Sequence, residues 1–273
     1  MLRNHRFFLL TAVAAALTSP VFSQTPVINK GGIVNGATFS GSEPVAPGAL
    51  ISIFGTDLAS KPAPADTVPL STKLGNVSVS INGVAAPLLY VSALQINAQV
   101  PWEAITEGTT KTVNVVVTTN GTPSQPQTVV VGPYSPGVFQ YLNHALVIIA
   151  TDPTDPRYGL IAAPPGTIPH LTTARAKAND VCLFYATGLG AVTPAAVTGA
   201  GSADHLRKVN VLPIVQVGGA HSRVEFAGLS PQFPGVYQVN IVIPGIPPSD
   251  TAPVQIIQGG ITTPADVTMA VGE

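Results

Sequence analysis

The chain has 273 residues, of which 45% are hydrophobic and only 9% are charged, and its formal net charge is −1. Disordered chains combine low hydrophobicity with high charge, so this composition predicts a folded protein. A nearly neutral chain has no basic surface to attract phosphates, and we expect no nucleic-acid partner. The length suits one large domain or two domains of about 100–130 residues.

The first residues have the pattern of a secretory signal peptide. Arg3 and Arg6 precede an apolar run at residues 7–17, which is shorter than the ~20 residues that a membrane span requires. We expect cleavage near Gln24, so that residues 1–23 form the signal peptide; an uncleaved anchor helix is the alternative. The mature protein is therefore expected to be secreted or extracytoplasmic, in the periplasm or at the cell surface, with no membrane span.

The remaining sequence is typical of β-structure. Its 27 prolines and 26 glycines separate short runs rich in Val, Ile and Thr. The predicted strands include residues 78–81, 113–119, 213–217 and 253–258. Several of these runs end at Gly or Asn-Gly, where a positive φ permits a tight turn. No amphipathic helix pattern is present, and we expect an all-β chain.

Four segments of the first part of the chain recur in the same order in the second part. The pairs are IFGTDL (53–58) with FYATGL (184–189), SINGVAAPLLYVS (80–92) with QVGGAHSRVEFAG (216–228), QINAQVP (95–101) with QVNIVIP (238–244), and VVVTTNG (115–121) with VQIIQGG (254–260). This order predicts a duplicated domain, in which residues 27–132 and 133–273 form two antiparallel β-sandwiches of the same topology. Superposition is expected to place Asn97 on Asn240 and Tyr90 on Phe226.

Within the segment QINAQV, amide side chains alternate with apolar side chains, as they do in a half-buried strand. Ile96 and Val100 are expected to face a core. Gln95, Asn97 and Gln99 are expected to face solvent or a neighbouring sheet. The amides are therefore interpreted as one face of a strand and not as a catalytic cluster.

Trp102 is the only tryptophan and directly follows this strand. One interpretation is that Trp102 and Tyr90 form an exposed platform on which a sugar stacks. The other is that Trp102 packs at the end of its sandwich or against the second domain. Trp102 and Tyr90 are the candidate ligand contacts.

The sequence contains no nucleophile-elbow, phosphate-loop or zinc-protease motif. Cys182 lies in an apolar run and is predicted to be a buried thiol. No histidine stands at metal-ligand spacing from another histidine or from the cysteine. Asp152 and Asp155 are interpreted as shaping a proline-containing loop, with a calcium site as the alternative. We assign no catalytic, metal or cofactor-binding residue and expect no cofactor.

Longer strings of the sequence resemble the Solibacter uncharacterised C-terminal domain family of exported bacterial proteins. They are GIVNGATF (32–39), VAPGALISIFGTDLA (45–59), LGNVSVSINGVAAPLLYVSALQINAQVPWE (74–103) and LFYATGLGAV (183–192). Each repeat is also similar to the IPT/TIG type of immunoglobulin-like domain. The resemblance implies two tandem immunoglobulin-like antiparallel β-sandwich domains, and it transfers no catalytic residues.

Together these features predict an exported, non-catalytic binding or structural module that contacts another protein or a cell-surface polysaccharide. One alternative is a secreted enzyme or accessory carbohydrate-binding protein with a site in its loops. Another is an outer-membrane β-barrel, although prolines interrupt the long alternating strands that a barrel needs. A contact surface is expected at the end that bears Trp102 and at loop 230–236, where the copies differ most.

Overall fold

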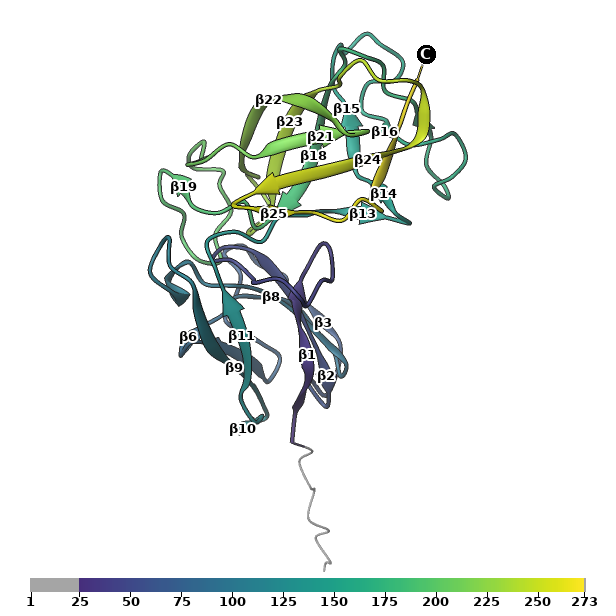
Figure 1. The fold of residues 1–273 in the computed structure, drawn as a ribbon. Helices are drawn as coiled ribbons and strands as arrows, with labels where there is room; N and C mark the ends of the chain where they lie inside the picture. The colour runs from purple at the N-terminus through teal and green to yellow at the C-terminus, as the bar shows by residue number, and fades with distance from the viewer. Residues whose placement is uncertain (1–24, 273) are drawn as a thin grey trace, which may run out of the picture.

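The computed structural model describes residues 25–272, and the expected signal peptide lies outside the described residues. These described residues are all-β and include one short 3-10 helix, η1 (Trp102–Ala104). Between residues 25 and 272, no helix is both long enough and apolar enough to cross a membrane. Figure 1 shows a first half (residues 25–132, purple to teal) and a second half (residues 133–272, teal to yellow), each with its own layers of strands.

The first half is a β-sandwich of two antiparallel sheets. Its strands are β1 (Val27–Asn35), β2 (Leu50–Thr56), β3 (Ala63–Pro64), β4 (Lys73–Leu74), β5 (Val77–Ile81), β6 (Val84–Ala85), β7 (Leu88–Val91), β8 (Gln95–Gln99), β9 (Lys111–Thr119), β10 (Thr122–Pro123) and β11 (Gln127–Val131). One sheet has the order β1-β2-β8-β7-β3, and the other has the order β10-β9-β5-β4, with β11 also on β9 and β6 on β5.

The second half contains the remaining strands. They are β12 (Gly137–Val138), β13 (Gln140–Tyr141), β14 (His144–Ala145), β15 (Val147–Ile149), β16 (Ile161–Ala162), β17 (Thr173–Ala174), β18 (Val181–Thr187), β19 (Val192–Thr193), β20 (Lys208–Val209), β21 (Ile214–Val217), β22 (Ala220–Leu229), β23 (Tyr237–Val242), β24 (Ser249–Gln258), β25 (Ile261–Thr262) and β26 (Thr268–Val271). Strand β22 connects the two layers, because its start pairs with β21 and its end pairs with β23.

Two-residue turns close the hairpins where the sequence predicts them. Asn82 and Gly83, between β5 and β6, both have positive φ (52° and 81°), as a type I′ turn requires. Asn120 and Gly121, between β9 and β10, repeat this conformation with φ of 52° and 82°. In the second half, glycine pairs at 218–219 and 259–260 occupy the corresponding hairpins with positive φ at both residues. The matching turns give the two halves the same hairpin geometry.

The strand pairings of the first half recur in the second. Strand β8 lies between β2 and β7, and β23 lies between β18 and β22 in the same antiparallel manner. Asn97 is opposite Tyr90, and Asn240 is opposite Phe226. A shift in register stands immediately before Tyr90 and before Phe226, so the two pairs occupy corresponding places next to corresponding bulges.

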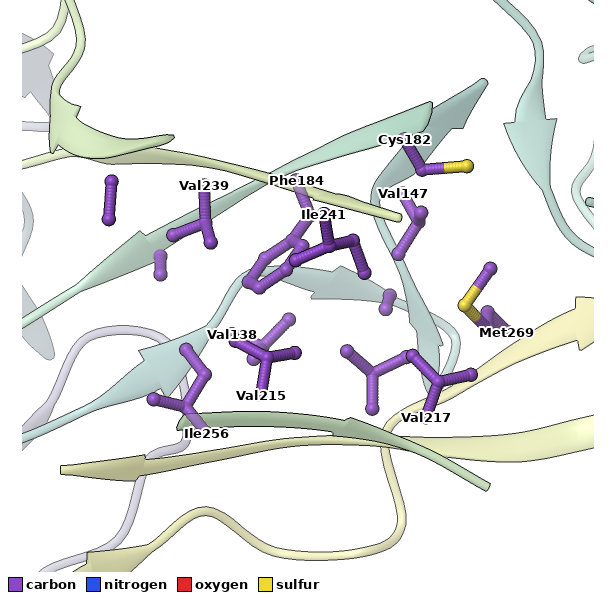
Figure 2. Packing of buried hydrophobic residues seen from close by; sticks show 14 of the residues in the cluster. Val138, Val147, Cys182, Phe184, Val215, Val217, Val239, Ile241, Ile256 and Met269 are labelled. Atoms are coloured by element: carbon purple, nitrogen blue, oxygen red, sulfur yellow. The ribbon is translucent and has the colours of Figure 1, made fainter. Parts of the chain in front are cut away.

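Each half has its own hydrophobic core. One cluster of buried side chains draws only on residues 28–131, and the other draws on residues 138–271. In the second core the ring of Phe184 lies between the layers, with Ile241 beside it and Val215 on the facing strand (Figure 2). Cys182 belongs to this core and is fully buried, which confirms the prediction from its apolar run. Trp102 is the first-half residue that packs against this second core.

Candidate functional site

Gln99 connects the two halves through its side-chain amide. It is the last residue of β8 and is buried, with 1% of its surface exposed. Its Nε2 donates to the carbonyl oxygen of Gly48 at 3.2 Å, and its Oε1 accepts from the backbone N–H of Gly199 at 2.7 Å. The prediction that Gln99 faces solvent or a neighbouring sheet is therefore wrong. The contact region between the two halves, which we call the junction, covers this end of the strand.

Two further buried side chains join the halves. Asn35 donates from Nδ2 to the carbonyl oxygen and the hydroxyl of Ser135, at 2.7 Å and 3.0 Å. The hydroxyl of Thr187 accepts from the backbone N–H of Leu50 and donates to the carbonyl oxygen of Gly235, both at 2.8 Å. These bonds satisfy buried backbone groups on both sides of the junction, so they fix how one half sits on the other.

Trp102 is held at the same junction. Its backbone N–H donates to the hydroxyl of Thr198 at 3.0 Å, and that hydroxyl donates to the Glu103 carboxylate at 2.6 Å. The benzene edge of its indole lies so close to Gly48 that a side chain there would overlap the ring. Its indole Nε1 is buried and has no hydrogen-bond partner among residues 25–272. The tryptophan therefore lies at the interface of the halves.

A pocket of about 250 Å³, which we call the junction pocket, opens beside Trp102. Both halves and the segment that connects them supply its walls. Its lining residues are Pro47, Trp102, Ile105, Glu107, Gly108, Pro133, Tyr134, Ala191, Val192, Ala195, Ala196, Asn210 and Val211. The walls are mainly apolar, with two aromatic rings and few polar groups, which is the usual make-up of a small-molecule site.

Tyr134 is the second aromatic residue of the junction pocket and comes from the connecting segment. Its ring packs against Gly190 and Gly259 of the second half, and a side chain at either glycine would overlap the ring. Both glycines also have positive φ, so glycine is favoured there by the backbone conformation as well as by the lack of space for a side chain. This close packing holds Tyr134 against the second half. The other aromatic wall of the pocket, Trp102, comes from the first half.

Two polar side chains of the junction pocket have unused hydrogen-bonding capacity. The Glu107 carboxylate takes part in no salt bridge or hydrogen bond with the described residues, and its side chain is exposed. Asn210 accepts from the Thr193 hydroxyl at 2.6 Å through Oδ1, which orients the amide and leaves Nδ2 as a donor. The pocket thus offers both an acceptor and a donor beside its aromatic walls.

The structure does not bring the two predicted contact residues together in one pocket. Tyr90 lies in β7, between Pro64 of β3 and Asn97 of β8, and it does not line the junction pocket. The interpretation of Trp102 as packing against the second half describes its surroundings correctly. Loop 230–236, the other expected contact region, also lies at the junction, where Gly235 approaches Leu50.

The acidic loop after β15 is shaped by its own side chains. Asp152 accepts from the backbone and the hydroxyl of Thr154 at 2.8 Å and 2.9 Å. Asp155 and Asp180 both bind Arg157, at 2.6 Å and 2.7 Å. Hydrogen bonds from Arg157 lower the pKa of the Asp155 carboxyl. Between residues 25 and 272, no group of three His, Cys, Asp or Glu side chains is placed to hold a metal ion.

Sequence reasoning found Trp102 but missed its partners in the pocket. Tyr134 lies in the connecting segment GPYSPG. An aromatic residue between two prolines in a short connection could have been predicted to pack against one of the halves. Glu107 and Asn210 carry no local signal, because they are separated by about a hundred residues and meet only when the halves pack together.

Comparisons with known proteins find solved structures with low sequence identity and low TM-scores, together with one family match. No curated protein sequence matches the chain. Similar solved structures include the full extracellular region of plexin A4 (12% identity, TM-score 0.26, covering 96% of this chain and 20% of that chain). A second is SGBP-B of the Bacteroides ovatus mixed-linkage glucan utilization locus, solved with a heptasaccharide (14% identity, TM-score 0.31, 84% of this chain and 43% of that chain). The chain spans less than half the length of either protein, and these likenesses carry no conclusion about its role.

A family match agrees with the observed fold of the first half. Residues 37–131 match the IPT/TIG domain family, and this match covers most of the first sandwich, from just after β1 to the end of β11. The first half of this chain is therefore similar to an IPT/TIG domain, an immunoglobulin-like fold.

Proposed function

We propose that the chain is an exported, non-catalytic binding module that contacts a cell-surface polysaccharide or another protein. In this proposal residues 27–132 and 133–273 are two immunoglobulin-like domains in tandem, and the chain is a member of the Solibacter uncharacterised C-terminal domain family. The repeated strand pairings, with Asn97 and Asn240 in corresponding places, support the two domains.

The junction pocket is the observation that carries the proposal. It combines aromatic walls with a free acceptor and a free donor, and buried hydrogen bonds hold its two sides in one orientation. A preformed concave site of this kind loses little freedom when a ligand binds, so it suits recognition. The low charge of the chain also favours short-range hydrogen bonding over electrostatic capture.

Binding of the purified mature chain to bacterial envelope material tests the proposal. We expect peptidoglycan sacculi or soluble envelope polysaccharides to retain the chain in pull-down and affinity-electrophoresis assays, without release of cleaved products. Retention by none of these materials and by no envelope protein would overturn the binding role. Release of a product from a bound polymer would instead identify an enzyme.

Export is tested separately by N-terminal sequencing. The mature chain is expected outside the cytoplasm, beginning near Gln24. Recovery of extracellular protein that still carries Arg3 and the apolar run would contradict cleavage.

A further inference from the structure

We propose that the junction pocket binds one pyranose ring of a glycan, with Trp102 and Tyr134 as its apolar walls and Glu107 and Asn210 as its hydrogen-bonding groups. This assignment rests on the proposed binding function and names its ligand class. It differs from a platform of Trp102 with Tyr90, because the second aromatic residue is Tyr134 and the site needs both halves.

The size of the pocket restricts its occupant. Pockets for drug-sized ligands have volumes of roughly 300–1,000 Å³, and the junction pocket has about 250 Å³. This space suits a single ring with its substituents. It does not accommodate a helix or a strand of a protein partner, which would need a longer groove.

The chemistry of the pocket matches the two characters of a sugar ring. A pyranose has an apolar face of C–H groups, which packs on aromatic rings such as those of Trp102 and Tyr134. Its hydroxyls both donate and accept, and they find the acceptor Glu107 and the donor Nδ2 of Asn210 at the same pocket. A purely hydrocarbon ligand would leave the Glu107 carboxylate without a partner and partly out of water, at a cost in free energy.

The charge of the pocket also selects among ligands. No Lys or Arg is among the lining residues, so the pocket contains nothing to pair with a phosphate or a sugar acid. One carboxylate is present, and it would attract an amine as well as a hydroxyl. A cation is therefore the competing ligand against which a sugar must be tested.

Trp102 provides a built-in reporter. Because the chain has one tryptophan, its fluorescence and its single indole N–H resonance come from the wall of this pocket. The indole Nε1 has no partner among residues 25–272. A bound sugar that packs on the indole changes its emission and also changes the chemical shift of the nearby, buried indole N–H.

The experiment titrates the purified mature chain with the methyl glycosides of glucose, galactose, mannose and N-acetylglucosamine, and with β-1,3- and β-1,4-linked glucose tetrasaccharides. We expect a saturable change in Trp102 fluorescence and in the indole N–H resonance with at least one sugar. Glu107→Gln is expected to weaken that affinity about tenfold, because it replaces a charged acceptor with a neutral amide that has one acceptor oxygen. Asn210→Ala is expected to weaken it about fivefold, because it removes the Nδ2 donor. Both side chains are exposed, so both variants are expected to fold.

Matched controls separate binding in this pocket from binding elsewhere on the chain. Glu225→Gln removes a carboxylate that pairs with Arg223 on β22, and Tyr90→Ala removes an aromatic ring on β7; neither residue lines the pocket. Both variants are expected to keep the affinity of the parent chain. Equal losses in Glu225→Gln and Glu107→Gln would overturn the assignment.

The remaining outcomes also decide the assignment. No saturable response to any of the sugars overturns it, and so does a response to tetramethylammonium alone, which would identify a cation site. If envelope material retains the chain while the pocket variants change nothing, the pyranose assignment fails and the binding function stands. If no material retains the chain, the binding function itself fails.

Discussion

At the scale of single residues, amides and hydroxyls rather than ion pairs hold the two halves together. Gln99, Asn35 and Thr187 are each buried, and each bonds to backbone groups or side chains across the junction. A buried polar group that loses its partner costs about 1–3 kcal/mol. Any other orientation of the halves would leave several such groups unpaired, and this cost favours the observed one.

Gln99→Ala is predicted to destabilise the protein by about 2–3 kcal/mol. It removes two hydrogen bonds and leaves the carbonyl of Gly48 and the N–H of Gly199 unpaired in the junction. Gln95→Ala is the control, since Gln95 is half-buried on the same strand and its side chain bonds only to the Asn97 side chain. Gln95→Ala is expected to lower the free energy of unfolding by less than about 1 kcal/mol. Urea denaturation checks both values, and equal losses would contradict the bridging role.

Cys182 is predicted to be unreactive in the native state. Burial is the main cause that raises the pKa of its thiol from 9.0 to about 12, and the charge of Asp180 adds to the shift. Because the folded chain holds this proton more tightly than the unfolded chain, the contribution of the thiol to stability is complete below pH 9. It falls as the pH rises toward 12. A thiol reagent at pH 8 should label the chain only after denaturant is added, and rapid labelling without denaturant would contradict the burial.

At the scale of strands and turns, the two halves repeat even small details. Gln95 donates from Nε2 to Oδ1 of Asn97 in β8, and Gln238 donates to Asn240 in β23 in the same way, both at 2.8 Å. The strand that carries each pair ends shortly before a proline. The residue after that proline differs between the halves, because Trp102 begins η1 in the first and Gly245 takes the corresponding place in the second.

Gly48→Ala is predicted to displace the indole of Trp102. A Cβ at this position would overlap the indole ring, and the residue also has a φ of +76°. Gly121→Ala is the matched control, because Gly121 has a φ of +82° and open space around it. In both variants an alanine must adopt a positive φ, which lowers the free energy of unfolding by about 1 kcal/mol. Only Gly48→Ala should shift the Trp102 emission maximum, and an unchanged spectrum would contradict the contact.

Strands and turns could be predicted because their signals are local. Alternating side chains identify β5 and β23, and Asn-Gly identifies the turn at residues 82–83. The junction could not be predicted in this way. Gln99 has the same place in the alternation as Gln95, and only the approach of Gly199, a hundred residues later, distinguishes them. A pattern within one strand contains no information on which end another domain covers.

At the scale of the whole molecule, the contacts at the junction hold the two halves in one fixed orientation. Each half keeps its own core; Trp102 of the first half packs against the second core, and Tyr134 of the connecting segment packs on Gly190 and Gly259 of the second half. The junction pocket exists only when the halves are packed in this orientation, since Glu107 belongs to the first half and Asn210 to the second. Ligand binding and the fixed orientation are therefore expected to stabilise each other.

Mapping of ligand-induced amide shifts by NMR on the intact mature chain tests this account most directly. With the sugar that gives the strongest Trp102 response, we predict shifts that cluster at Trp102 and residues 105–108 of the first half and at residues 191–196 and 210–211 of the second. Shifts confined to one half, or clustered around Tyr90 away from the junction, would contradict a binding site built by both halves.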